Sequence, residues 1–233
     1  MRAIKRFYKI ATVTADLGVA LDGKPVKTPG KAALLLPTAA LAEAVAAEWQ
    51  SQGEKVLPAT MLLTKLANTA IDRVGPEKPR IVAEMVDYAG SDLVCYRAGR
   101  PPDLVERQNA MWNPVIAWAL VTLDAPFEAV PGVMHRPQSP EALRAVGEAL
   151  GALNDYQLAA LHNIMTITGS ALIALMLAKR AILPDAAWEA AHVDEDFQIA
   201  QWGHDDEATA RRQRRHREFL ACCDFVELCR TQS

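Results

Sequence analysis

The chain has 233 residues, of which 51% are hydrophobic and 23% are charged, and its formal net charge is -3. This composition is ordinary for a folded globule that can bury a real core. The net charge excludes a general attraction to nucleic acid or to anionic membranes, so any electrostatic recognition has to come from local patches.

Short strands are predicted between residues 6 and 36, where apolar runs alternate with turn residues. Asp22-Gly23 is a favoured hairpin turn, because both central residues tolerate positive φ. A helix is predicted from an N-cap at Thr38 to Gly53, where a left-handed residue would end it. A second helix is predicted over residues 60–74 and would end at Gly75-Pro76. We therefore expect about three or four antiparallel strands covered by helices.

Beyond Gly75-Pro76 the pattern is helical nearly to the end, apart from an extended loop over residues 125–138. The Asn113-Pro114 step is expected to break a helical pattern, since proline lacks an amide hydrogen and crowds the preceding turn. The apolar stretch Ile164–Ala178 is shorter than the roughly 20 residues of a membrane span and is read as a buried helix. The remaining predicted helices cover residues 80–88, 103–112, 114–122 and 184–203, with further starts at Ser139-Pro140, at Asn154 with Gln157, and at Asp205-Asp206-Glu207.

The fold class predicted from these patterns is α+β. Residues 1–77 would form a small two-layer α+β domain, with short antiparallel strands and covering helices. Residues 78–233 would form a mostly α-helical bundle domain. Trp49, Trp112 and Trp118 occupy helical apolar positions and are expected to be structural.

Motifs for catalysis are largely missing from the sequence. The 12 glycines are scattered, and no phosphate-binding loop of the GxGxxG or GxxxxGK[ST] kind occurs. Thr168-Gly169-Ser170 lacks the flanking glycines of a nucleophile elbow and is read as a small-residue contact between helices. Cys95, Cys222, Cys223 and Cys229 are expected to be reduced, buried thiols and not zinc ligands, because ligands spaced along one helix do not converge.

One polar cluster keeps an enzymatic alternative open. Glu189 and His192 have the Glu-x-x-His spacing of carboxylate-bridged metal sites, and Asp194 follows closely. A metal-dependent hydrolase using these three residues is the alternative function. Such sites need a second copy of the motif, and none exists, so a surface polar cluster is favoured and no metal or other cofactor is expected.

The run Arg211–Arg217 is the strongest local charge feature. Consecutive helical residues step by about 100°, so its arginines are spread around the helix and do not line one face. A solvated helix face is favoured over a contact with nucleic acid, because no basic groove with interleaved aromatics is visible.

Several blocks of sequence, in order and across nearly the whole chain, are similar to one family. It comprises the chaperones that bind the free alpha subunit of the F-type ATP synthase during assembly of its catalytic head. The similar blocks are Arg6-Phe7-Tyr8-Lys9, Leu21 to Pro29, Leu41 to Gln52, Pro58 to Asp72, Ser91 to Arg97, Gln108 to Trp118, and Asp194 to Gln198 followed by Trp202-Gly203.

The resemblance implies a molecular chaperone and not an enzyme. Its partner would be the alpha subunit, which it keeps from aggregating until the beta subunit takes over, with neither nucleotide nor metal required. The family also implies a small α/β part followed by a helical bundle. We expect a monomer without membrane insertion in the bacterial cytoplasm, since eukaryotic members, which work in the mitochondrial matrix, carry a presequence that is not recognised at Met1.

The candidate partner-binding residues come from a segment near the C-terminus that matches an acidic and aromatic motif of the family. A tryptophan beside acids is typical of an interface anchor with a polar rim. The alternative is that Trp202 caps the bundle core and Glu207 serves a helix N-terminus. The predicted binding residues are Glu195, Gln198, Trp202, Asp205 and Glu207.

Overall fold

The computed structural model describes residues 4–132, 134–203 and 205–230. Contacts divide the chain into two units. Unit 1 comprises the residues up to Lys78, Asn154–Ala160 and the residues from Ala221 on, and unit 2 comprises Pro79–Leu153 and Leu161–Leu220. Unit 1 thus includes two segments that the sequence assigned to the helical domain, and the division into residues 1–77 and 78–233 stays a prediction.

The strands of unit 1 are short and antiparallel. A three-stranded sheet has the order β2-β3-β4, and β1 pairs separately with β5. Asp22 and Gly23 have φ of 48° and 78°, which confirms the predicted hairpin turn between β3 and β4. The strands are β1 (Ile4–Lys5), β2 (Ala11–Val13), β3 (Val19–Leu21), β4 (Lys24–Pro25) and β5 (Lys55–Val56).

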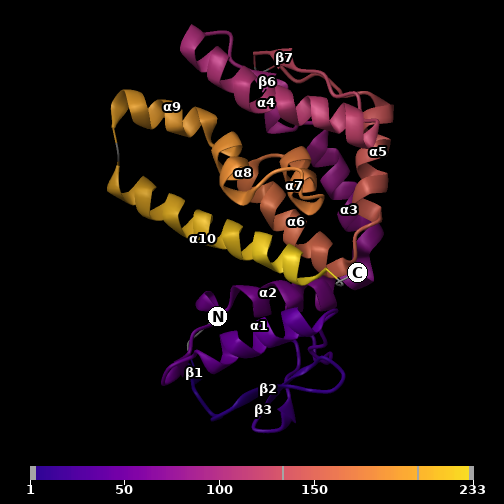
Figure 1. Cartoon of the computed structure of the whole chain (residues 1–233), viewed down its shortest axis with the longest axis vertical. Helices are drawn as coiled ribbons and strands as arrows, with labels where there is room; N and C mark the ends of the chain where they lie inside the picture. Colours follow the sequence, from indigo (N-terminus) through magenta and orange to yellow (C-terminus); the bar gives the residue numbers. More distant parts are fainter. Residues whose placement is uncertain (1–3, 133, 204, 231–233) are drawn as a thin grey trace. The chain divides into compact units, whose positions relative to one another are not determined.

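Helix α1 (Ala39–Gln50) packs on β2 and β3, as Figure 1 shows. The Thr38 hydroxyl accepts a hydrogen bond from the Leu41 amide at 3.1 Å, which confirms the predicted N-cap. The expected left-handed end at Gly53 is wrong, because Ser51 caps the helix in a right-handed conformation. The Arg6 guanidinium donates to the carbonyls of Gln50 and Gln52, so these groups need no glycine-based cap.

The predicted helical end at Gly75-Pro76 is also wrong. Four helical segments follow one another, and between Leu62 and Ala89 the backbone leaves helical geometry at Glu77, with φ -121° and ψ 18°. Pro79 explains the position of this kink, because its ring crowds the turn before it. The segments are η1 (Pro58–Thr60), α2 (Leu62–Thr69), the π-helical η2 (Ala70–Val74) and α3 (Gly75–Ala89).

Unit 2 is built mainly from helices, as expected. Its two short strands, β6 (Tyr96–Arg97) and β7 (Val130–Pro131), are parallel and were not predicted. Helices α6 and α10 also supply residues to unit 1. The helical elements from residue 93 onward are η3 (Leu93–Cys95), α4 (Pro102–Leu123), α5 (Pro140–Gly151), α6 (Asp155–Thr168), α7 (Ala171–Ala178), α8 (Pro184–Ala191), α9 (Val193–Trp202) and α10 (Asp206–Leu228).

Two of the predicted helix starts are confirmed by side-chain hydrogen bonds. The Ser139 hydroxyl accepts from the Ala142 amide at 3.1 Å and caps α5. Asn154 and Gln157 form a reciprocal capping box at the start of α6, because each side-chain oxygen accepts from the other residue's amide.

The predicted break at Asn113-Pro114 does not occur, and α4 runs through it. Pro114 is exposed, so water can hydrate the carbonyl that its missing amide leaves free. Trp112 and Val115 on either side are fully or nearly fully buried. Their burial holds the helix together across the proline.

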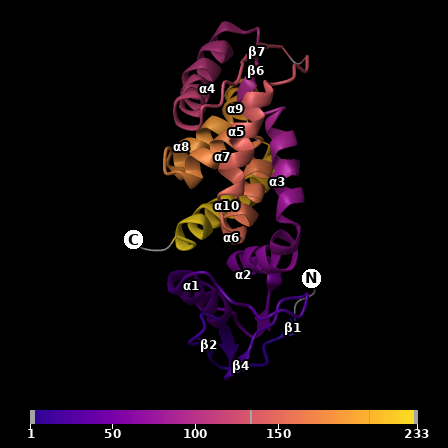
Figure 2. The ribbon, with the colours of Figure 1, turned by 90° about the vertical axis from the view of Figure 1, so that its right-hand side faces the viewer.

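The apolar stretch from Ile164 to Ala178 is largely buried, with Thr166 exposed, but it forms two helices. Gly169 has φ 74° and ends α6, and the Ser170 hydroxyl caps α7 by accepting from the Ile173 amide at 3.0 Å. All eight residues of α7 are buried, and Figures 1 and 2 show it inside unit 2. None of the helices among the described residues is long and apolar enough to cross a membrane.

Candidate functional site

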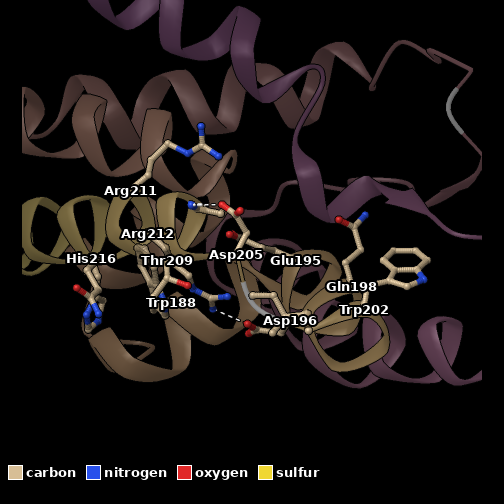
Figure 3. A pocket seen from close by; sticks show the side chains of 14 residues that line it. Trp188, Glu195, Asp196, Gln198, Trp202, Asp205, Thr209, Arg211, Arg212 and His216 are labelled. Atoms are coloured by element: carbon tan, nitrogen blue, oxygen red, sulfur yellow. Dashed lines mark hydrogen bonds and ion pairs between the residues drawn. The ribbon is translucent and has the colours of Figure 1, made fainter.

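A hollow of about 620 Å³ lies between α9 and the first half of α10, both in unit 2 (Figure 3). Four of the five predicted binding residues line it: Glu195, Gln198, Trp202 and Asp205. Glu207 does not line it. It lies in the first turn of α10, where an acid stabilises the positive end of the helix, as the alternative interpretation holds.

The turn between α9 and α10 creates this hollow. Gly203 ends α9 with φ 86°, a conformation that favours glycine and that confirms the predicted helix end. The Asp205 carboxylate then caps α10 by accepting from the Ala208 amide at 2.7 Å. The sequence predicted one helix over residues 184–203, but His192 (φ -118°) separates α8 from α9.

Trp202 is the most conspicuous residue at the hollow. Its side chain is 79% exposed, so it does not cap the bundle core. Figure 3 shows its indole at the margin of the hollow, directed away from Trp188. A large aromatic side chain held at the end of a helix and open to solvent has the character of an interface anchor.

The inner wall of the hollow is aromatic. Trp188 is almost buried and stacks on His192, with 3.7 Å between the ring centroids. The His216 ring lies 4.6 Å from it and the Phe219 ring 5.4 Å. Burial lowers the pKa of His192, which favours a neutral imidazole within this stack.

One ion pair ties the two helices of the hollow together. Arg212 contacts the Asp196 carboxylate at 2.5 Å, the pair joined by a dashed line in Figure 3, and its guanidinium lies 5.9 Å from the Trp188 ring. Glu195 Oε2 lies 4.0 Å from the neutral His192 imidazole, a contact within the start of α9. One pair therefore fixes α10 against α9, while Gln198, Trp202 and Asp205 stay open to a partner.

The segment around the hollow is strongly acidic. Between Pro184 and Glu207 the sequence has no lysine or arginine. Its acids are Asp185, Glu189, Asp194, Glu195, Asp196, Asp205, Asp206 and Glu207. An acidic rim around an exposed indole is complementary to a partner segment that carries basic and apolar side chains.

The metal-hydrolase alternative is unsupported. His192 Nδ1 lies 2.8 Å from the Trp188 carbonyl, Asp194 accepts from Gln108 Nε2 at 2.7 Å, and Glu189 is exposed. In the described part of the chain, no three histidine, cysteine or acidic side chains are grouped so that they could hold a metal ion.

Asp194 belongs instead to a partly buried polar network that the sequence did not reveal. Gln108 donates to Asp194 and accepts from the Ala98 amide at 2.7 Å. The nearly buried Arg97 donates to the Gln108 carbonyl at 3.2 Å, and its guanidinium lies over the Trp112 ring at 5.3 Å. This network joins α4 to α9 and thereby supports the helix that carries the predicted binding residues.

The cysteines are buried and free, as predicted. Burial raises the pKa of Cys95, Cys223 and Cys229 to about 12, so these groups remain thiols at neutral pH.

The arginines of the Arg211–Arg217 run point to different sides of α10, as their spacing predicted. Arg212 pairs with Asp196, Arg215 donates to the Ile167 carbonyl at 2.6 Å, and the other arginines of the run are exposed.

Sequence reasoning missed the inner wall of the hollow. Trp188, Arg212 and His216 lie up to 28 residues apart in the chain and meet only because α10 folds back along α9. The acidic segment and its tryptophan were visible in the sequence. The packing of α10 against this segment was not visible in the sequence.

Comparison with known proteins gives the family. The model of the ATP12 chaperone protein family matches residues 5–120. The crystal structure of Atp12 from Paracoccus denitrificans is 37% identical, with 97% of this chain and 98% of that chain covered and a TM-score of 0.91. The structure of a candidate chaperone from Agrobacterium tumefaciens is 41% identical, with 98% and 87% covered and a TM-score of 0.93.

A curated relative is more distant. The mitochondrial protein atp12 of Schizosaccharomyces pombe is 23% identical over 230 residues, which cover 88% of this chain and 76% of that protein. The bacterial structures match almost end to end at more than a third identity, so the resemblance seen in the motifs is confirmed. The chain belongs to the ATP12 chaperone family, whose members are ATP synthase assembly chaperones and not enzymes.

Proposed function

We propose that this chaperone binds the free alpha subunit of the F-type ATP synthase and keeps it from aggregating until the beta subunit pairs with it. An unassembled subunit exposes an apolar interface, and such patches drive aggregation unless they are covered. Covering them requires affinity and exchange but no chemistry. The protein would act as a monomer in the bacterial cytoplasm, a location that the bacterial relatives support.

The observation that carries the proposal is the hollow between α9 and α10. Its exposed Trp202, next to the acids Glu195 and Asp205, offers a central apolar anchor with a polar rim. Gln198 adds an amide that can donate and accept hydrogen bonds at the same edge. Glu207 contributes charge to the surrounding field without lining the hollow.

The test is an aggregation assay with the purified alpha subunit. Its light scattering is followed with and without equimolar chaperone, in the absence of nucleotide. We expect the chaperone to suppress the scattering, and we expect added beta subunit to displace it from the alpha subunit. The purified beta subunit and an unrelated aggregating protein serve as matched controls. Equal suppression of all three proteins would contradict specificity for the alpha subunit, and no suppression would contradict the function.

A further inference from the structure

A second group of exposed apolar side chains lies in unit 1, outside the hollow. Phe7 is 67% exposed, Ile10 59% and Leu57 45%. Lysines lie between and beside them in the sequence. The Phe7 surface, as we call this group, consists of Lys5, Phe7, Lys9, Ile10, Lys55 and Leu57, all of which belong to unit 1.

The backbone that carries Phe7 and Ile10 is held in place although it forms no strand. The Arg6 guanidinium donates to the carbonyls of Tyr8 at 3.1 Å and Lys9 at 2.9 Å, and also to two carbonyls at the end of α1. The Asp22 carboxylate accepts from the amides of Lys9 and Ile10 at 3.1 and 2.9 Å. Both apolar side chains are therefore presented on a fixed segment, which lowers the entropy lost on binding.

Two lysines of this surface face each other across a strand pair. Lys5 and Lys55 are register partners on β1 and β5, so two like charges lie directly opposite each other, an unfavourable arrangement. Leu57 follows in extended conformation and shares the face of Lys55. Within the described residues, Lys5 and Lys55 form no ion pair, whereas Lys9 interacts electrostatically with the Asp22 carboxylate. An acidic group from outside would relieve the repulsion.

We infer that the Phe7 surface is a second contact site for the client protein and takes a segment that combines acidic with apolar side chains. The inference rests on the proposed function and extends it. The segment from Pro184 to Glu207, which carries Trp202 at the hollow in unit 2, is acidic, so the two sites would select segments of opposite charge. Two modest sites in one chain raise the affinity for a client that reaches both.

A protein client fits this surface better than an anionic membrane does. The whole chain carries a formal charge of -3, and the acidic segment from Pro184 to Glu207 contains no lysine or arginine. A lipid surface attracts a protein through a large basic field, whereas three lysines around apolar side chains suit a discrete acidic segment.

The experiment measures binding of the purified alpha subunit to variants of the full chain. We expect Phe7→Ser to weaken binding by at least about tenfold, the size of an interface hot spot. Lys5→Glu combined with Lys55→Glu should also weaken it and reduce its dependence on salt. The controls are Val121→Ser, at an apolar side chain that is 84% exposed in unit 2, and Lys65→Glu, at an exposed lysine of α2, and both should bind as the wild type does.

The possible outcomes separate this inference from the proposed function. If Phe7→Ser is folded and binds as tightly as the wild type, the second site is refuted while the function stands. If the wild type itself does not bind the alpha subunit, the function fails and this inference fails with it. The inference is also overturned if Phe7→Ser changes only binding to vesicles of phosphatidylcholine and phosphatidylserine, or only self-association in sedimentation.

Discussion

Replacing Trp202 by alanine should abolish most client binding without affecting the fold. A tryptophan can bury about 250 Å², so the 79% of Trp202 that is exposed corresponds to about 200 Å². At about 25 cal/mol per Å², covering that surface would be worth at most about 5 kcal/mol. Ordering and imperfect contacts reduce this ceiling, and measured hot spots lie at about 2–4 kcal/mol, so Kd should rise by roughly 30- to 1,000-fold.

The assay combines calorimetric titration of the alpha subunit with thermal unfolding of each chaperone variant. Leu183→Ala is the matched control, because Leu183 is 75% exposed in unit 2 but does not line the hollow. We expect Leu183→Ala to bind normally and both variants to melt like the wild type. Normal binding by Trp202→Ala would refute the hollow as the binding site, and a large drop in its melting temperature would show that Trp202 serves the core.

Two further predictions concern stability. Trp112 is fully buried, and its indole donates a hydrogen bond to the Ala190 carbonyl at 2.7 Å. Trp112→Ala should therefore lower the free energy of unfolding, measured by denaturant titration, by about 3–5 kcal/mol. A loss below about 1 kcal/mol would contradict its place in the core. Burial raises the pKa of the Asp92 carboxyl from 3.8 to about 6. The folded protein therefore binds the carboxyl proton more tightly than the unfolded chain does, and protonated Asp92 favours folding most below about pH 4. Wild-type stability should therefore fall by about 3 kcal/mol relative to Asp92→Asn as the pH rises through 6, and parallel pH profiles of the two proteins would refute this.

Features set by local chemistry were readable from the sequence. The N-caps at Thr38 and Ser139, the capping box at Asn154 and the turn at Asp22-Gly23 depend only on side chains reaching nearby backbone groups. The same holds for the end of α9 at Gly203. These elements need no information about the rest of the fold.

Helix breaks were less predictable because tertiary packing competes with local preference. Pro114 fails to break α4, since the buried Trp112 holds the helix and water reaches the exposed proline turn. Conversely, the apolar stretch Ile164–Ala178 was predicted as one helix, yet the chain turns at Gly169. The carboxylate of the buried Asp92 accepts a hydrogen bond from the Leu172 amide, at 3.0 Å, in the first turn of α7. The two residues are 80 positions apart in the sequence, so no local pattern predicts this contact.

The sequence by itself determined the family, the α+β class and the acidic segment with Trp202, because ordered motifs and local composition carry that information. Only the tertiary structure decided what surrounds this segment. Trp188, His216 and Arg212 complete the hollow because α10 returns along α9. The exposed Phe7 follows Arg6, which is bonded to carbonyls at the end of α1. Contacts between residues distant in the chain depend on the packing of whole elements, which no local pattern encodes.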